Sequence, residues 1–144
     1  MRYIPYLSFN GDCREAFEFY ALVFDGEIKG MFSHADAPIA DEIPEELRGR
    51  IMNAYMVADG AELMGADSMP HAGGDVKPAG FCVSIHLDDE DRAKRIFDAF
   101  AEGGTIVMPY GPTFWARQFG MVTDRYGMPW MINCGMVEEA GAAA

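Results

Sequence analysis

The chain repeats one order of predicted secondary structure, and this repeat limits its fold more than any other feature. Each copy has a strand, then a helix with apolar residues at steps of three and four, and then three more strands. The predicted strands are residues 3–9, 27–32, 51–58 and 61–65 in the first copy, and 81–87, 105–108, 118–123 and 129–134 in the second. Asp12 and either Asp88 or Asp89 are expected to cap the two helices. The sequence therefore predicts a βαβββ module that is present twice.

The two copies also match residue by residue. Residues 56–59 are Met-Val-Ala-Asp, and residues 121–124 are Met-Val-Thr-Asp. Five residues around the first helix match five around the second at a constant offset of 77: Asp12, Ala16, Phe19, Tyr20 and Gly26 with Asp89, Ala93, Ile96, Phe97 and Gly103. A module this small cannot bury its sheet alone, so two modules have to pair, within the chain or between chains. We predict one domain over residues 1–144, made of modules at about 1–66 and 80–135 and a linker at 67–79.

The charge of the chain argues against several classes of partner. It has 11 basic and 23 acidic residues, and a net charge of −12 repels nucleic acid and anionic membrane surfaces. The longest stretch without a charged residue, 103–116, is too short and too interrupted by proline to span a bilayer. The first residues lack the apolar core of a signal peptide, and three cysteines without a Cys-x-x-Cys motif suit a reducing compartment. We expect a cytoplasmic protein that binds neither nucleic acid nor membrane.

Four stretches of the sequence carry a resemblance to a known family. They are residues 6–20, residues 63–67, residues 113–124 (Thr-Phe-Trp-Ala-Arg-Gln-Phe-Gly-Met-Val-Thr-Asp) and residues 126–133 (Tyr-Gly-Met-Pro-Trp-Met-Ile-Asn). With the tandem βαβββ order, they make the chain resemble the PhnB-like branch of the vicinal-oxygen-chelate superfamily, which includes glyoxalase I, bleomycin-resistance proteins and extradiol dioxygenases. The resemblance implies an α+β fold whose modules form half-barrel sheets with helices on the convex side. It also implies a small-molecule ligand and a homodimer, because proteins of this superfamily commonly build cavities from modules of two subunits.

The superfamily resemblance further implies four metal-ligand positions, on the first and last strand of each module. They fall on Pro5, Met64, Cys82 and Met131. A divalent ion that activates oxygen needs hard oxygen or nitrogen donors, whereas proline has no donor and methionine offers a soft thioether. Cys82 could ligate, but one thiolate does not make a site. We therefore expect no metal and no other cofactor, and a divalent metal is kept as the alternative.

The strand at 81–87 supplies further site candidates. Its residues alternate between apolar and polar, so the polar set is expected to face the cavity while the apolar set faces the helix. The residues expected to face the cavity are Cys82, Ser84 and His86. His86 with Glu62 is the best metal or acid–base pair that the sequence offers. His34 and His71 lie in predicted loops and are weaker candidates.

The last strand and the loop before it are expected to complete the cavity. Met131 and Asn133 should face inward if Trp130 and Ile132 pack on the helix. The residues expected at the mouth are Thr113, Phe114, Trp115, Arg117 and Phe119. An apolar pocket with a few polar groups is typical of small-molecule sites. Arg117 could hold a carboxylate or phosphate group of a ligand, or it could pair with an acidic residue of the chain.

Two hypotheses of function follow from these observations. The first is a metal-independent protein that binds or sequesters a small molecule of unknown identity. The alternative is a metal-dependent lyase or dioxygenase of the vicinal-oxygen-chelate type, with a relocated site near Glu62 and His86. Some PhnB-like proteins are described as demethylubiquinone methyltransferases. The sequence does not support that activity, because it has no glycine-rich loop between a parallel strand and a helix.

Overall fold

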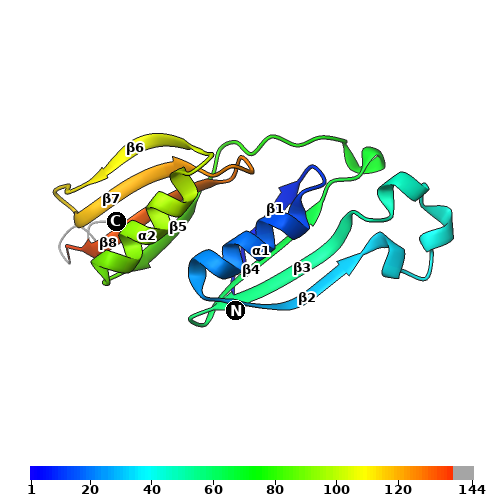
Figure 1. The fold of residues 1–144 in the computed structure, drawn as a ribbon, viewed down its shortest axis with the longest axis horizontal. Coiled ribbons are helices and arrows are strands. Elements are labelled where there is room, and N and C mark those ends of the chain that lie inside the picture. The colour runs from blue at the N-terminus through cyan, green and yellow to red at the C-terminus, as the bar shows by residue number, and fades with distance from the viewer. Residues whose placement is uncertain (138–144) are drawn as a thin grey trace. The chain divides into compact units, whose positions relative to one another are not determined.

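The computed structural model describes residues 1–137, which form two compact units (Figure 1). The first unit is Met1–Lys77, and the second begins at Pro78. Within the described residues, each unit contains one α-helix of 12 residues and one four-stranded sheet, which confirms the predicted βαβββ order and the α+β class. Neither helix is long and apolar enough to cross a membrane.

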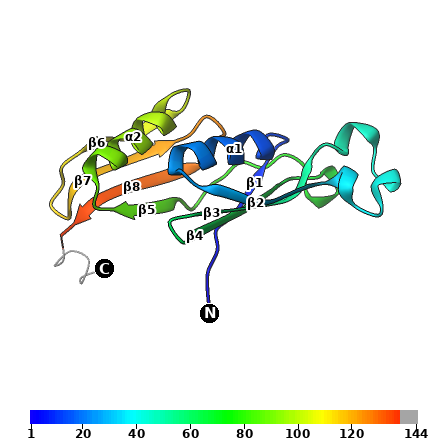
Figure 2. The ribbon, with the colours of Figure 1, turned by 60° about the horizontal axis from the view of Figure 1, so that its bottom comes forward.

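In the first unit, helix α1 covers one face of the sheet and leaves the other face without a helix (Figure 2). The elements are β1 (Tyr6–Phe9), α1 (Cys13–Phe24), β2 (Glu27–Ser33), β3 (Ile51–Ala58) and β4 (Ala61–Asp67). The strand order is β1-β4-β3-β2, in which β1 is parallel to β4 and the other pairs are antiparallel. Between β2 and β3, a loop rich in acidic residues, termed the acidic loop, forms three 3₁₀ turns: His34–Asp36, Ala40–Glu42 and Glu45–Leu47.

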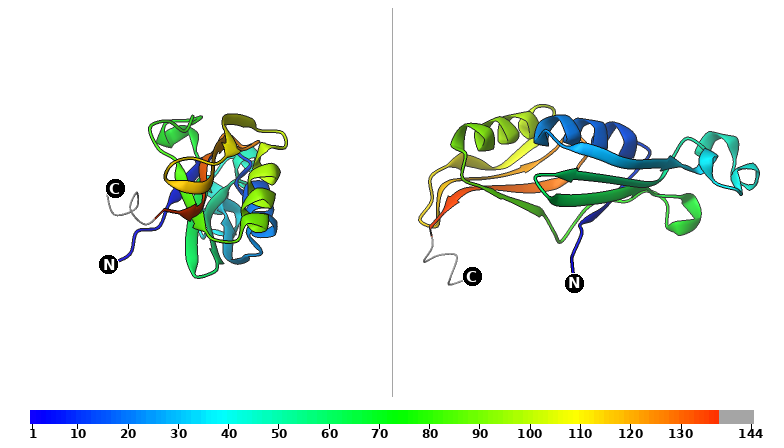
Figure 3. Two further views of the ribbon diagram at one scale, coloured as in Figure 1. Left: turned by 90° about the vertical axis from the view of Figure 1, so that its left-hand side faces the viewer. Right: turned by 90° about the horizontal axis from the view of Figure 1, so that it is seen from below.

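The second unit has the same arrangement, with α2 on one side of its sheet (Figure 3, right). The elements are β5 (Val83–Leu87), α2 (Glu90–Ala101), β6 (Thr105–Gly111), β7 (Ala116–Thr123) and β8 (Pro129–Met136). The strand order is β5-β8-β7-β6, and β5 is parallel to β8. Because each sheet has one face under a helix and one without, side chains alternate between the core and the helix-free face.

The core of each unit lies between its helix and its sheet. In the first unit, Phe17 and Tyr20 of α1 pack on Phe9, with ring centroids 6.1 and 6.4 Å from that of Phe9. In the second unit, Phe100 of α2 stacks on Trp130 at 4.7 Å. Such ring pairs contribute about 0.5–1.5 kcal/mol beyond the area that they remove from water. Aromatic packing therefore joins each helix to its own sheet.

The packing of the two helices repeats at a different offset from their sequence. Helices α1 and α2 begin 77 residues apart, at Cys13 and Glu90, as the sequence predicts. The buried residues are Cys13, Ala16, Phe17 and Tyr20 in α1, and Ala93, Ile96, Phe97 and Phe100 in α2. Burial thus begins in the first turn of α1 but in the second turn of α2. The four buried positions keep the same spacing but repeat at an offset of 80 rather than 77, so Ala16 and Tyr20 are buried like Ala93 and Phe97, whereas Cys13 is buried and Glu90 is not.

Asp67 holds the backbone at the start of α1. Its Oδ1 accepts hydrogen bonds from the backbone N–H groups of Gly11 and Cys13, at 2.9 and 3.0 Å. Asp12 occupies the predicted N-cap position of α1, but its side chain makes no capping hydrogen bond. Asp89 caps α2 as predicted, because its side chain accepts the N–H of the third helical residue at 3.0 Å. The carboxylate that fixes the start of α1 thus comes from the end of β4.

The segment predicted as a linker, residues 67–79, is bound to the first unit over most of its length. Asn10 binds Val76 twice, because its Nδ2 donates to the carbonyl at 2.8 Å and its Oδ1 accepts the N–H at 2.7 Å. The N–H of Ser68 donates to the carbonyl of Phe9 at 2.7 Å. These bonds assign the segment up to Val76 to the first unit.

Strand ends are where prediction and structure differ most. β1 and β5 begin later than predicted, whereas β6, β7 and β8 extend beyond the predicted ranges. The extensions find backbone partners on neighbouring strands, as Ala116 does with Met136 and Gly111 with Phe119. A strand continues for as long as a neighbour offers it backbone partners, and local sequence alternation does not report that.

Candidate functional site

The helix-free face of the second sheet carries residues that the sequence predicts for a cavity. Along β5, Ser84 and His86 are exposed, whereas Val83, Ile85 and Leu87 are half-buried. The alternation therefore has the predicted phase, and the two polar side chains point away from α2.

Strand register places the side chains of this face in two neighbouring rows. One row is formed by Ser84, Met131, Met121 and Met108. The next row is formed by His86, Asn133, Phe119 and Gly111. Residues directly opposite each other on adjacent strands point to the same face. The face therefore changes from polar at β5 to apolar at β7 and β6, and its three methionines are termed the methionine row.

Three side chains of this face form a chain of hydrogen bonds. Nδ2 of Asn133 donates to Oγ of Ser84 at 2.9 Å, and the same Oγ lies 2.8 Å from Nε2 of His86. Because Oγ of Ser84 accepts from Asn133, its own hydrogen can bond to Nε2, which leaves the proton of a neutral imidazole on Nδ1. Asn133 is buried, whereas His86 is exposed. The chain therefore runs from the sheet to a ring that a ligand can reach.

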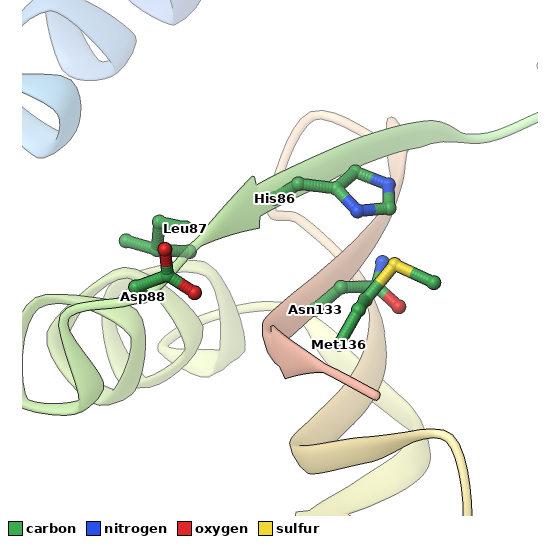
Figure 4. A pocket seen from close by; sticks show the side chains of 5 residues that line it. All are labelled: His86, Leu87, Asp88, Asn133 and Met136. Carbon is green, nitrogen blue, oxygen red and sulfur yellow. The ribbon is translucent and has the colours of Figure 1, made fainter. Parts of the chain in front are cut away.

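An open hollow of about 230 Å³ lies beside this chain, where β5 and β8 end. The residues that line it are His86, Leu87, Asp88, Asn133 and Met136. Figure 4 shows the side chains of Asn133 and Met136 close to the ring of His86, with Asp88 at the end of β5. Small-molecule pockets are commonly about 300–1,000 Å³. This hollow can therefore hold one end of a ligand whose remainder lies on the face of the sheet.

The aromatic rings in and after the loop before β7 differ in their exposure to solvent. Phe114 is 85% exposed and packs edge-on against Trp115, with 4.8 Å between ring centroids. Trp115 lies 5.1 Å from Phe119, which is buried. The hydroxyl of Thr113 accepts the N–H of Ala116 at 3.1 Å and fixes the turn into β7. The loop thus presents one exposed ring beside a packed pair.

Arg117 is paired within the chain. Its Nε donates to Oε1 of Glu90 at 2.9 Å, and its Nη2 donates to the carbonyl of Asp88 at 2.9 Å. The hydrogen bond to Glu90 raises the pKa of Arg117 above its usual range. Of the two roles that the sequence leaves open, the structure shows pairing with an acidic residue. Recognition of a ligand carboxylate or phosphate stays a prediction and would require Arg117 to leave Glu90.

The four positions that the resemblance assigns to a metal offer no set of hard donors. Met64 and Met131 lie in strands, whereas Pro5 precedes β1 and Cys82 precedes β5. The register places Ser84, rather than Cys82, opposite Met131. Among residues 1–137, no group of three or more His, Cys, Asp or Glu side chains could hold a metal ion. These residues do not fit the hard divalent ion of glyoxalase-like enzymes.

Glu62 and His86, predicted as a metal or acid–base pair, belong to different units and bind different partners. Oε1 of Glu62 accepts the hydroxyl of Tyr55 at 2.7 Å, and Oε2 lies 3.3 Å from Nε of Arg2. His86 has its hydrogen bond with Ser84 in the second unit. Action of Glu62 and His86 in one site stays a prediction.

The other histidines and the cysteines offer less chemistry. His34 and His71 lie in 3₁₀ turns of loops, where they were predicted. Burial raises the pKa of the thiols of Cys13 and Cys134, which keeps them protonated and unreactive at neutral pH. Cys82 is half-buried and has a free thiol.

Sequence reasoning missed four residues at or beside the hollow, and one of them, Leu87, was predicted to face the helix with the apolar set of its strand. Asp88 and Met136 line it, and Glu90 binds Arg117. Asp88 was predicted as a helix cap, and Met136 lies beyond the predicted end of the last strand, so neither carried a signal of its own. The charge of Arg117 could have predicted an acidic partner, but not which one.

Comparison with known proteins finds relatives over nearly the whole chain. The sequence model of a family described as 3-demethylubiquinone-9 3-methyltransferase matches residues 1–133. Protein YjdN of Escherichia coli K12 is 34% identical over 137 residues, which cover 90% of this chain and 92% of YjdN.

Solved structures with the same fold include two with substantial sequence identity. Protein PA1353 from Pseudomonas aeruginosa is 41% identical, with a TM-score of 0.85 over 94% of this chain and 98% of that chain. A PhnB protein from Bacillus cereus is 26% identical, with a TM-score of 0.77 over 94% of this chain and 100% of that chain. The fosfomycin resistance protein FosX from Listeria monocytogenes, at 11% identity and a TM-score of 0.64 over 97% of this chain and 96% of FosX, shares the fold alone.

Proposed function

Because the chain belongs to the PhnB-like family within the glyoxalase and fosfomycin-resistance superfamily, we propose that it is a metal-independent protein that binds or sequesters a small molecule. Membership supplies the fold and not the activity, since one fold hosts many chemistries. The proposed binding site is therefore argued from the side chains on the helix-free face of the second sheet.

The hydrogen-bonded chain of Asn133, Ser84 and His86 carries this proposal. It begins in the sheet and ends at an exposed imidazole beside the hollow, where a ligand can exchange a hydrogen bond. The methionine row next to it offers flexible, polarizable side chains that adapt to apolar surfaces. We therefore expect a ligand with a flat apolar body over Met121 and Met131 and a hydrogen-bonding group at His86.

Donor chemistry supports binding without a metal ion. Thioethers at Met64 and Met131 replace the nitrogen and carboxylate donors that a hard divalent ion needs. A lyase or dioxygenase of this superfamily would need its ion elsewhere. Glu62 and His86 remain the residues for that alternative function.

The methyl transfer named in the family's description is not part of this proposal. Nucleotide cofactors commonly bind at the carboxyl edge of a doubly wound parallel sheet, beside a glycine-rich loop. Each sheet of this chain instead has one parallel pair next to antiparallel strands. This arrangement favours ligand binding over chemistry with such a cofactor.

The proposal includes a cytoplasmic homodimer. Strands β1 and β2 are the edges of one sheet, and β5 and β6 are the edges of the other. Edge strands carry unpaired backbone groups that proteins generally cover, and a two-fold dimer is the commonest closed assembly. The free thiols of the three cysteines suit a reducing compartment.

A screen of metabolites and aromatic antibiotics by thermal denaturation tests the binding proposal. A ligand at a hundred times its Kd should add about 2.7 kcal/mol of stability, and treatment with EDTA should leave this gain unchanged. His86→Ala and Ser84→Ala should each weaken the affinity for the ligand by about three- to tenfold, which is the effect of one lost hydrogen bond. His71→Ala, which removes a loop histidine, is the matched control. Binding that is lost with EDTA and restored by a divalent ion would overturn the proposal in favour of the metal-dependent alternative.

A further inference from the structure

The helix-free face of the first sheet carries aromatic and polar residues that lie outside the proposed binding site of the second sheet. Register places Tyr6 and Tyr55 on either side of Met64, so two phenol rings flank one methionine on this face. Glu62 lies two residues before Met64 in β4 and points to the same face. The hydroxyl of Tyr6 donates to Oδ1 of Asn53 at 3.3 Å. These five residues, termed the tyrosine face, combine an aromatic surface with one carboxylate.

The carboxylate of Glu62 is held in place on the tyrosine face. Its Oε1 accepts the hydroxyl of Tyr55 at 2.7 Å, and its side chain is 17% exposed. The hydrogen bond to Glu62 raises the pKa of Tyr55, which keeps the phenol a donor. Since one oxygen is fixed in this way, the other oxygen keeps its lone pairs for a second donor. Glu62 is therefore a preorganised acceptor.

Arg2, the cation that pairs with Glu62, is held less firmly than the carboxylate. Nε of Arg2 lies 3.3 Å from Oε2 of Glu62, but the side chain of Arg2 is 72% exposed and belongs to the segment before β1. An ion pair with so exposed a partner contributes little net free energy, because solvent screens it and a long side chain has to be held in place. Another cation with better contacts can therefore replace Arg2.

We propose that the tyrosine face binds the amidinium or guanidinium group of an aromatic small molecule, and that Arg2 is a displaceable occupant of the same site. A planar fork of N–H donors matches a carboxylate, and the aromatic body of the ligand can pack on Tyr6 and Tyr55. The net charge of −12 attracts a cation toward the protein. This inference is independent of the proposed function, because all of its residues lie in the first unit.

Calorimetric titration of the full chain with benzamidine tests the inference. Benzamidine joins an amidinium to a phenyl ring, and benzamide is the uncharged control of the same shape. Arg2→Ala should tighten benzamidine binding by about two- to fivefold, because it removes a weakly held competitor. Glu62→Gln should weaken it by about tenfold or more, since a charge-assisted hydrogen bond is lost, and Tyr55→Phe should weaken it less. Glu27→Gln is the matched control, because it removes a carboxylate of the same sheet that pairs with Lys29 at 2.8 Å.

The outcomes separate a ligand site from a simple surface ion pair. Failure of benzamidine to bind either wild type or Arg2→Ala would overturn the inference. Equal affinity in wild type and Glu62→Gln, or equal affinity for benzamide, would also overturn it. If Glu62→Gln does not fold, the gain in Arg2→Ala and the loss in Tyr55→Phe decide the question.

Discussion

The indole N–H of Trp130 donates a hydrogen bond to Oδ2 of Asp124 at 2.9 Å within the core of the second unit. Oδ1 of the same carboxylate accepts the backbone N–H groups of Tyr126 and Met128 at 2.8 and 3.0 Å. One buried carboxylate thus fixes the turn between β7 and β8 and orients the ring on which Phe100 stacks. The turn joins two of the stretches that resemble the family, residues 113–124 and 126–133, so these stretches help to fix the fold.

Asp124→Ala should therefore lower the free energy of unfolding by about 3 kcal/mol or more, because it leaves buried donors without an acceptor. Asp124→Asn should cost less, because one amide oxygen still accepts hydrogen bonds. Urea unfolding followed by tryptophan fluorescence measures both effects. Asp41→Ala, in the acidic loop, is the control and should stay within about 0.5 kcal/mol of wild type. An equally mild Asp124→Ala would contradict this role.

Gly65 allows β1 and α1 to approach β4 closely. A Cβ added there would lie 2.8 Å from the carbonyl oxygen of Leu7 and 2.8 Å from the ring of Phe17. The carbonyl is part of the β1–β4 pairing and cannot move aside freely. Gly65→Ala should therefore destabilise the protein by about 1–3 kcal/mol in calorimetric melting. Gly111→Ala is the matched strand control, because an added Cβ meets nothing within 4 Å there, and a similar loss in both variants would refute the steric explanation.

The order of elements could be predicted because it depends on patterns between near neighbours. Both helices begin where the spacing of apolar residues and an aspartate predict. The packing of α1 could not be predicted in this way. Its first N–H binds Asp67, which is 54 residues away in the sequence, and no local pattern connects Cys13 with that carboxylate.

Tyr110 should make the stability of the protein depend on pH in the alkaline range. Its buried hydroxyl has no hydrogen-bond partner among residues 1–137, and burial raises its pKa to about 12. A tyrosine of the unfolded chain loses its proton near pH 10, so between about pH 10 and pH 12 the folded state holds more protons, and this contribution to stability falls as pH rises.

Tyr110→Phe should remove the part of the decrease in unfolding free energy at alkaline pH that comes from this hydroxyl. At pH 7 it should be neutral or stabilising, because an unsatisfied hydroxyl disappears while the contact with Phe97 at 5.3 Å is kept. Urea midpoints of both proteins from about pH 8 to about pH 11 make the comparison. A variant that loses stability at pH 7, or that shows the full alkaline decrease, would disprove the assignment.

The candidate site could be predicted in part, for the same reason as the fold. Alternation along one strand places Ser84 and His86 on the helix-free face, and it does the same for Asn133 in β8. The hydrogen bonds among the three depend on the register between β5 and β8, which is a tertiary property. The pairing of Arg117 with Glu90 also depends on the tertiary structure, because the two residues are 27 positions apart in the sequence.

The proposed homodimer predicts a mass of twice 15.9 kDa in light scattering at micromolar concentration. Each copy carries a net charge of −12, so repulsion between the copies opposes association at low ionic strength. At physiological concentration, salt screens the repulsion between charges that are farther apart than about 8–10 Å. The stabilisation from burying apolar surface does not depend on this screening. The dimer should therefore be more populated at about 0.15 M salt than at about 0.01 M, where the screening length is roughly 30 Å. A dimer that is more populated at low salt would mean that ion pairs hold the interface. A mass near 15.9 kDa at both salt concentrations would contradict the dimer and leave the four edge strands to be covered within one chain.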